Sequence, residues 1–511
     1  MSVFFRRTCG AAFIYAIATQ GAWADLTAEQ VWADWQAYMA GMGYEVAGQQ
    51  NRSGDTTTIS DIAMTMELPE DDGTVRLTWP EMTLTENGDG TVTLGFPQSF
   101  PMVVSGEADG ETFRAELAYE HQGLSMVVSG TPEDMTYEYS ADMLGVRLAS
   151  LEADGETLPA DAAEVGFDLT GMEGVSRMQV GEQRRVEQSF AAAQMAYVLA
   201  FDDPEGTDNA DIRGTLSDLA FEGGGVIPQG MTAGDYQSMV EAGFDFAGDF
   251  SFAAGQTAMA GTSTEDGQET SFALNSTSQG GALSVAMNGE HLAYDVSQNA
   301  TQIAVQSSDL PFPVELAMAE FGLALDVPVQ KAEEAQPFSI SMNLTDFTMS
   351  DMIWQMFDPA GQLPRDPATV ALDLTGMAKV LVDMFDPEVA ETLEATGAAP
   401  GELESLKINE LLVSLLGARL TGTGDFEFDN ANTQAFGGMP APEGTANLTL
   451  SGANALLDKL IGMGFMSEED AMGARMMMGM LAVPGDAPDT LKSTIEITGD
   501  GQILANGQRI K

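Results

Sequence analysis

Histidine, which commonly acts in catalysis, is rare in this chain of 511 residues. There are two histidines, His121 and His291, and each lies in a segment that alternates like a β-strand. A histidine beside a carboxylate and a serine can hydrolyse a substrate, but no serine lies in a nucleophile-elbow motif. The 78 acidic residues also make any single carboxylate pair uninformative. We therefore expect no catalytic residues, and we keep a hydrolase that uses a histidine with carboxylates as the alternative.

Five methionines crowd one short segment near the C-terminus, and they are Met472, Met476, Met477, Met478 and Met480. Thioether sulfur is a soft ligand that suits copper(I). Methionine is also an adaptable packing residue, and the chain contains 32 of them. The pattern favours an apolar helix that packs in a core, with copper binding as a lesser alternative. We expect no metal site and no cofactor.

The charge balance excludes one large class of partners. Lys and Arg number 20 against 78 Asp and Glu, which gives a formal net charge of −58. Such a surface repels phosphate backbones, so we expect no nucleic-acid partner. The acids are scattered along the chain rather than clustered, which favours a general role in solubility over recognition of one cationic partner.

Residues 1–24 have the three regions of a secretory signal peptide. Arg6 and Arg7 are positive, Cys9 to Thr19 form the apolar region, and Ala22 to Ala24 form a small-residue cleavage site. We predict cleavage after Ala24 and export to the periplasm, with no later transmembrane span. The remaining chain has no cysteine, and therefore no disulfide and no thiolate chemistry.

The elements that position these residues follow a recurring strand-to-helix pattern. From Asn447 to Ser451 leucines alternate with polar residues, as in a strand with one buried face. From Ala453 to Met463 apolar residues then recur at helical spacing. Similar units begin near Met342 and Leu372. These units predict strands that are covered on one face by short helices.

Other segments extend this pattern. We predict a helix within Thr27 to Gly43 and another over Glu468 to Leu481, with Ser467 as its cap. The stretch from Gln188 to Phe201 is rich in alanine, yet its apolar residues alternate, and we interpret it as a strand. We also interpret Leu411 to Phe428 as strand.

The fold class that follows is mainly β (α+β), with large curved antiparallel sheets and short helices packed on one face. We predict an N-terminal β-rich domain over residues 25–327, a linker over 328–337 where proline and charged residues interrupt the pattern, and a C-terminal α+β domain over 338–511. The pentapeptide Asp168 to Met172 recurs at Asp373 to Met377. This recurrence indicates two similar halves.

One run of residues connects the chain with a family. Asp358 to Thr369 reads Asp-Pro-Ala-Gly-Gln-Leu-Pro-Arg-Asp-Pro-Ala-Thr and leads into Leu372 to Gly376. With the tryptophan-containing helix of Thr27 to Gly43 and the closing run Asn506 to Gln508, it resembles an alphaproteobacterial periplasmic family catalogued only as a domain of unknown function. The resemblance spans nearly the whole mature chain. More distantly, the chain is similar to YdgA-like and AsmA-like envelope proteins.

The resemblance implies a location and a class of function, but no catalytic residues. Some YdgA-like and AsmA-like proteins form open β-structures that hold or pass lipids. We therefore expect a non-enzymatic envelope protein that binds or transfers an apolar ligand such as a lipid, or that acts as a scaffold for another envelope protein. Within the run, Pro364 and Pro367 flank Arg365, which we expect to have a structural role by holding backbone carbonyls or Asp358.

Overall fold

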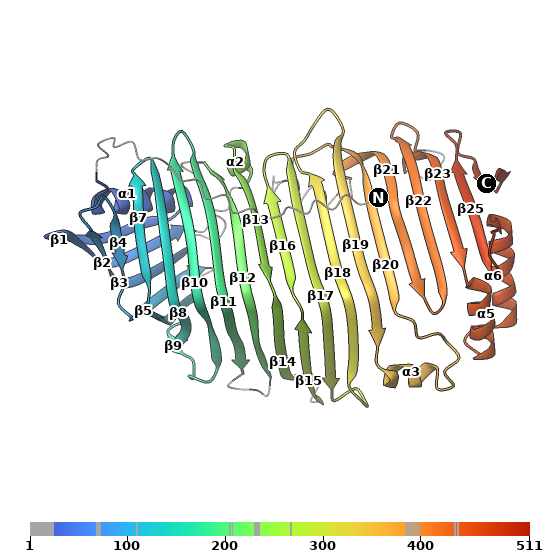
Figure 1. The fold of residues 1–511 in the computed structure, drawn as a ribbon, viewed down its shortest axis with the longest axis horizontal. Coiled ribbons are helices and arrows are strands. Elements are labelled where there is room, and N and C mark those ends of the chain that lie inside the picture. The colour runs from blue at the N-terminus through green and yellow to red at the C-terminus, as the bar shows by residue number, and fades with distance from the viewer. Residues whose placement is uncertain are drawn as a thin grey trace.

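The computed structural model describes residues 25–510, with the exception of 68–72, 109–110, 204–205, 207, 229–235, 266–267, 385–388, 390–392, 394–395, 397–398, 434–435 and 437–438. Strands account for 66% of these described residues and helices for 12%. In this described part, 27 strands form one antiparallel sheet and five short helices accompany it (Figure 1). The predicted mainly β fold is confirmed. The predicted signal peptide lies outside the described residues.

The strands of the first part are β1 (Glu45–Ser53), β2 (Thr56–Glu67), β3 (Thr74–Glu86), β4 (Val92–Gly95), β5 (Ser99–Ala108), β6 (Glu111–Gln122), β7 (Ser125–Thr131), β8 (Asp134–Ala153), β9 (Glu156–Thr157), β10 (Ala163–Val180), β11 (Arg184–Asp202) and β12 (Asn209–Ile227). They are followed by β13 (Asp245–Phe252), β14 (Ala254–Glu265), β15 (Gln268–Ser278), β16 (Gly281–Met287), β17 (His291–Ser307), β18 (Val314–Pro328), β19 (Gln336–Met349) and β20 (Ala368–Val380). The last are β21 (Gly401–Leu415), β22 (Ala418–Asp429), β23 (Ala441–Ser451), β24 (Val483–Pro484), β25 (Thr490–Ile497), β26 (Ile503–Ala505) and β27 (Gln508–Arg509). The helices are α1 (Ala28–Gly41), α2 (Tyr236–Glu241), α3 (Asp351–Phe357), α5 (Ala453–Gly462) and α6 (Glu468–Leu481).

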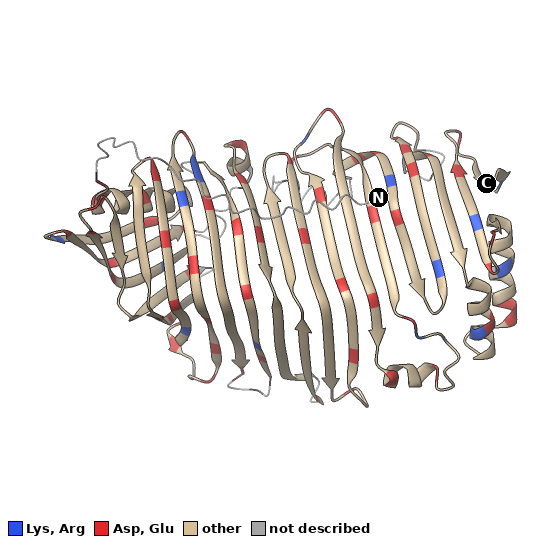
Figure 2. Ribbon diagram, viewed as in Figure 1, with Lys and Arg blue, Asp and Glu red and all other residues tan. Residues whose placement is uncertain are grey.

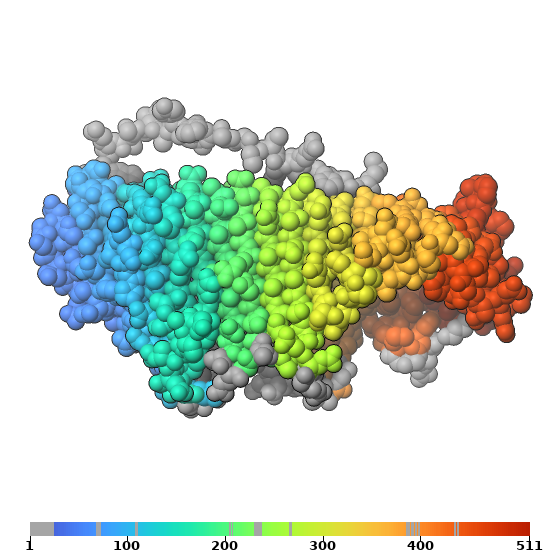
Figure 3. Space-filling model, turned by 90° about the horizontal axis from the view of Figure 1, so that it is seen from below, coloured from blue at the N-terminus to red at the C-terminus, as the bar shows by residue number. Residues whose placement is uncertain are grey.

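The sheet is a long meander in which strands that follow one another along the chain lie side by side. Its long axis therefore runs across the strands (Figure 1), and the colours follow the chain from blue to red along that axis (Figure 3). One pairing scheme occurs twice. β3 pairs with both β4 and β5, β4 then pairs with β7 and β5 with β6, and β8 joins the two branches. β12 pairs with β13 and β14 in the same way, and β17 joins the branches through β16 and β15.

A second repeat precedes β1 and β13. The sequence Gly-Tyr-Glu-Val-Ala-Gly at 43–48 returns as Gly-Phe-Asp-Phe-Ala-Gly at 243–248. Both copies end a helix in the same manner: the Tyr44 amide donates to the Met39 carbonyl at 2.9 Å, and the Phe244 amide donates to that of Met239 at 3.0 Å. The glycine before each aromatic residue has a positive φ, 87° and 91°. These repeats agree with two similar halves.

Several strands contain, away from their ends, a bend at a single residue in the left-handed backbone region. The φ angles are 50° at Asp61, 60° at Gly171, 50° at Asp218, 45° at Ala300 and 52° at Asp346. Such a residue breaks the strict alternation of side chains, so apolar residues before and after it fall on the same side of the sheet. Trp79 and Met82 of β3, only three residues apart and next to the bend at Asp61, accordingly line one cavity.

The sheet is open rather than folded into a compact body. The chain exposes 29693 Å² of surface, whereas a compact protein of 54.0 kDa exposes about 18,000 Å². Among the described residues, no helix is both long and apolar enough to cross a membrane.

The local sequence predictions fare differently. The helix of Thr27 to Gly43, the strand in Gln188 to Phe201 and the helix Glu468 to Leu481 are confirmed as α1, β11 and α6. The strand prediction over Leu411 to Phe428 is confirmed by β21 and β22, which are separated by a left-handed turn at Leu416 and Gly417. The predicted linker 328–337 lies between β18 and β19, which pair directly, so the sheet continues across it. The division into two domains stays a prediction.

Candidate apolar binding face

One side of the sheet is apolar along its whole middle section, and we call it the apolar face. Its clearest mark is a row of nine directly opposed residues in consecutive strand positions from β11 to β21. The row consists of Phe190, Phe221, Phe250, Leu283, Val296, Leu323, Met342, Leu372 and Leu411. Because neighbouring strands lie about 4.8 Å apart, this row is ~40 Å long.

The other side of the same strands is acidic and polar. The sequence neighbours of the row form a second row of directly opposed residues on this other side. They are Ser189, Glu222, Asp249, Ser284, Asp295, Ala324, Ser341, Asp373 and Glu410. Acidic residues occur along the sheet, whereas Lys and Arg are sparse (Figure 2). From β10 to β19, Arg184 is the one charged residue among the described side chains on the apolar face. The alternation therefore separates apolar from charged residues almost completely.

Aromatic rings lie flat on this face because glycines stand opposite them. A Cβ added at any of six glycines would lie 2.3–2.7 Å from the aromatic side chain of its cross-strand partner. The pairs are Phe113 with Gly106, Tyr139 with Gly174, Tyr197 with Gly214, Phe252 with Gly281, Phe272 with Gly261, and Phe338 with Gly376. Each ring covers the bare backbone of the neighbouring strand. The result is a smooth apolar surface.

Large apolar side chains of this face remain exposed to solvent. Eight of them are between 36% and 48% exposed, and they are Phe113, Phe167, Leu199, Phe201, Phe272, Phe321, Ile340 and Met342. They come from strands β6 to β19, so the exposure extends along the sheet. Single exposed apolar residues are normal, but a contiguous apolar surface of this extent marks a site of interaction.

At the N-terminal end, α1 covers the apolar face. The sheet curls there, and α1 lies against β1, β2 and β3 (Figure 1). Val31 and Trp32 of α1 are almost fully buried against Ile59, Leu84 and other residues of the core. The capping box of Thr27 and Gln30 begins the helix. This end of the sheet therefore has a conventional hydrophobic core.

A cavity of about 240 Å³ remains between α1 and the sheet. Its walls include Trp32, Trp35 and Tyr38 of α1 and Trp79 and Met178 of the sheet. The Trp35 ring lies 5.3 Å from that of Trp32 and 5.9 Å from that of Trp79, between ring centroids. The cavity is thus a pocket with aromatic walls at the covered end of the apolar face.

A buried ion pair holds α1 on the face. The Arg184 guanidinium donates to Asp34 Oδ1 at 2.7 Å, and both side chains are about 95% buried. The Tyr137 hydroxyl donates to the other Asp34 oxygen at 3.3 Å. Burial, together with the Asp34 charge, raises the pKa of Tyr137. Arg184 also lies over the Tyr38 ring, 5.6 Å from its centroid. The charged residue of the apolar face therefore has its partner on the helix.

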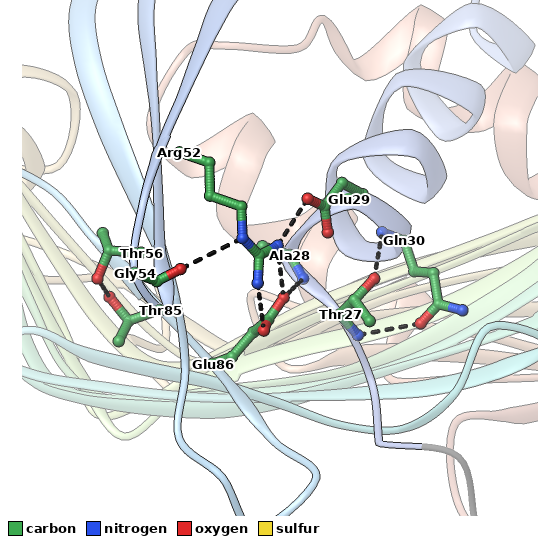
Figure 4. A network of polar contacts seen from close by, with 9 residues as sticks. All are labelled: Thr27, Ala28, Glu29, Gln30, Arg52, Gly54, Thr56, Thr85 and Glu86. Atoms are coloured by element: carbon green, nitrogen blue, oxygen red, sulfur yellow. Dashed lines mark hydrogen bonds and ion pairs between the residues drawn. The ribbon is translucent and has the colours of Figure 1, made fainter.

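An exposed network holds the start of α1 (Figure 4). Arg52 of β1 binds Glu29 at 2.7 Å and Glu86 at 2.8 Å, and Glu86 accepts a hydrogen bond from the Ala28 amide at 3.0 Å. The Arg52 hydrogen bonds lower the pKa of both glutamates. α1 is thus joined to β1 and β3 at its first turn and to β11 in its middle.

A larger hollow of about 480 Å³ lies over β8 to β15, next to the charged residues of the acidic side. Its two arginines are already neutralised. Arg147 is paired with Asp168, and Arg213 binds Glu164 at 2.7 Å and Asp211 at 2.8 Å. The hollow is shallow, and we see no chemistry in it that singles out a ligand.

The two histidines lie far apart in the sheet and differ in their surroundings. His121 is buried, with Nε2 3.3 Å from the Phe96 carbonyl and its ring beside Tyr119. His291 Nδ1 lies 2.8 Å from Asp326 Oδ1. Among the described residues, neither ring is hydrogen-bonded to a hydroxyl group, and no three His, Cys, Asp or Glu side chains are grouped to hold a metal. The hydrolase alternative stays a prediction.

The structure corrects two expectations, one about the methionines of α6 and one about Arg365. Four methionines of α6 are exposed rather than packed in a core: Met472, Met476, Met477 and Met480. Their helix lies beside α5 and β25, at the C-terminal end of the sheet (Figure 1).

Arg365 does not hold Asp358. It binds Asp351 at 2.7 Å and lies 5.5 Å from the centroid of Trp354. Asp358 instead accepts the amides of Gln362 and Leu363, each at 2.8 Å, and so closes the turn after α3. The amides of the turn supply the hydrogen bonds of the Asp358 carboxylate, and Arg365 pairs with Asp351 of α3 instead.

Comparison with known proteins identifies a family. The chain matches the family described as "Uncharacterized protein conserved in bacteria (DUF2125)" over residues 241–506, just over half of its length. The match includes the Asp358 to Thr369 run and the C-terminal part of the apolar face. No curated protein and no solved structure matches the chain. The chain belongs to the DUF2125 family of uncharacterized bacterial proteins.

Proposed function

We propose that this protein is an exported envelope protein that holds the acyl chains of lipids on its apolar face and passes them along it. The observation that carries the proposal is the uncovered apolar face, which continues across the strands from β11 to β21. The resemblance to YdgA-like and AsmA-like proteins that we expect from the sequence, and the predicted periplasmic location, suit the same function.

A bare apolar surface of this size requires an apolar partner. Soluble monomers rarely expose contiguous apolar patches larger than a few hundred Å². The nine-residue row alone is ~40 Å long, and apolar residues flank it on both sides along the strands. Covering such a surface contributes roughly 25 cal/mol for each Å² removed from water. Acyl chains can provide this cover without any specific hydrogen bonds.

The distribution of aromatic and charged side chains on the two sides of the sheet favours a lipid over a folded protein as the partner of the apolar face. Protein interfaces combine an apolar centre with polar groups that pair across the contact. Here the rings of residues such as Tyr197 and Phe272 lie flat, and from β10 to β19 all charged residues except Arg184, among the described side chains, lie on the opposite side. The aromatic-walled cavity under α1 adds a concave end where a chain terminus can be buried. The acidic side stays in water and keeps the protein out of the bilayer.

A matched pair of variants tests the proposal. Leu323 and Met342 are directly opposed on the apolar face, and Ala324 and Ser341 are opposed one residue further on the acidic side. Replacing both members of either pair with aspartate adds the same two charges at the same place in the sheet. The measurement is the transfer of a fluorescent phosphatidylethanolamine from vesicles to the purified mature protein.

We expect the wild type and the Ala324→Asp/Ser341→Asp variant to extract the lipid, and the Leu323→Asp/Met342→Asp variant to extract far less. Circular dichroism of both variants controls for folding. If the two variants extract lipid equally, the apolar face is not the binding site. If even the wild type takes up none, the lipid proposal fails and the scaffold role remains.

A further inference from the structure

The exposed methionines of α6 share one side of the helix. Met472, Met476 and Met480 are spaced by four residues, and Met477 lies three residues before Met480. Residues at these spacings are neighbours on a helix surface, with Cβ atoms about 5–6 Å apart. The side chains are 67%, 73%, 57% and 59% exposed in the order just given. Four thioethers therefore lie next to one another at the surface.

The opposite side of α6 fixes its orientation. Ala471 is fully buried, and Arg475 connects the helix to α5 by binding Asp458 at 2.5 Å and Asn454 at 3.2 Å. The Ser467 hydroxyl accepts the Asp470 amide at 3.0 Å and begins the helix. Because these contacts lie away from the exposed methionines, the thioethers stay accessible without any rearrangement of the fold.

The chemistry of these side chains is selective. Thioether sulfur is a soft ligand, and soft ligands favour copper(I) over hard cations. A methionine side chain has three rotatable bonds, so sulfurs on neighbouring turns can converge on one ion. Three acidic residues, Glu468, Glu469 and Asp470, form the first turn of the same helix. Their charge and that of the whole chain attract cations to this end of the molecule.

We propose that α6 binds one copper(I) ion through thioether sulfurs of Met472, Met476, Met477 and Met480. The triangle of Met476, Met477 and Met480 supplies three sulfurs, and Met472 lies one turn away as a fourth. The site is independent of the apolar face and of lipid binding. It gives this acidic chain a soft-metal function that its histidines and carboxylates do not provide.

The test is an anaerobic titration of copper(I) into the purified mature protein, with bicinchoninate as a coloured competitor. We expect one ion per chain, with a dissociation constant on the order of 1 μM or below. The decisive variant replaces the four methionines with leucine. Leucine keeps the apolar volume and the helix propensity, so α6 should fold, as circular dichroism can verify.

The helix α3 offers a matched control. It exposes two methionines, Met352 and Met356, also four residues apart. Replacing both with leucine should leave copper binding unchanged, whereas the α6 variant should bind at least tenfold more weakly. X-ray absorption should show sulfur as the only first-shell ligand type. The proposal is overturned if the wild type binds no copper(I), if the α6 variant retains it, or if the ion has oxygen ligands.

Discussion

α1 covers the apolar face at the N-terminal end, whereas from β12 to β19 the same face is exposed to solvent. At the covered end, Trp32 and Val31 pack on the sheet and are nearly inaccessible. In the middle, Phe321 and Met342 are 36% and 39% exposed. The strands have the same alternation in both regions, so the difference is in the cover and not in the sheet itself.

This difference shows what is needed to hold a protein segment on the face. α1 is anchored by Arg184, a charged residue placed among apolar neighbours, and by Arg52 at the edge. The middle of the face has no comparable charged anchor among its described side chains. It is suited to an apolar occupant that can move, whereas the N-terminal end is built for one fixed helix.

We expect the largest effect when the buried ion pair that anchors α1 at the covered end is removed. Arg184→Met leaves Asp34 buried without its ion partner, and we expect the free energy of unfolding to fall by about 3–5 kcal/mol. Urea unfolding followed by tryptophan fluorescence reports on the loss, because Trp32 and Trp35 lie in α1.

Two controls accompany this measurement. Arg213→Met removes two solvent-exposed ion pairs, with Glu164 and Asp211, and should change the free energy of unfolding far less than Arg184→Met does. Asp34→Leu combined with Arg184→Met should regain most of the lost stability, since no unpaired charge stays buried. A single Arg184 variant as stable as the Arg213 variant would show that packing alone holds the helix.

Glycine variants compare the covered end of the apolar face with its open middle, and we expect them to change the free energy of unfolding by a smaller amount. Gly174→Val pushes against Tyr139, which lines the cavity under α1, and its ring has little room to move. We expect a loss of about 3 kcal/mol in the free energy of unfolding. Gly248→Val pushes against the rings of Phe221 and Phe246, which can move outward in the open middle of the face, and the expected loss is about 1 kcal/mol. Equal losses, measured by urea unfolding, would mean that the two regions are equally confined.

The smallest effect concerns the exposed network around Arg52. The hydrogen bonds from Arg52 hold the pKa of Glu29 and Glu86 below the ordinary glutamate value. Their contribution is therefore present above that value and is lost as the pH falls through the lowered pKa. We expect Arg52→Gln to lower the free energy of unfolding only slightly at neutral pH, and we expect this loss to disappear as the pH falls through the lowered pKa values. A difference between the two proteins that persists at low pH would contradict this origin.

Local patterns in the sequence predict much of this fold. The alternation in Gln188 to Phe201 outweighs its alanine content, because one face of β11 must be apolar. Ser467 and the helical spacing after it define α6 to the residue. The apolar face itself follows from such alternation in many strands. These features depend on neighbours in the chain, which is why the sequence reveals them.

Other features depend on contacts that no local pattern contains. The left-handed residues Gly171 and Asp218 shift the alternation within single strands, so each strand looks like two unrelated halves. Arg184 and Asp34 meet across 150 residues of chain. The one signal for this pair was a charged residue at an apolar position of β11. The exposure of the α6 methionines depends on where the sheet ends, which the sequence does not state.

The most direct test of lipid binding by the apolar face is to measure the lipid that the protein carries after purification. The mature protein, isolated from its own bacterial envelope without detergent, is extracted with organic solvent, and the extract is analysed by mass spectrometry. We predict lipid in at least equimolar amount to the protein, lost in the Leu323→Asp/Met342→Asp variant. Protein that is folded and monomeric yet free of lipid would contradict the account.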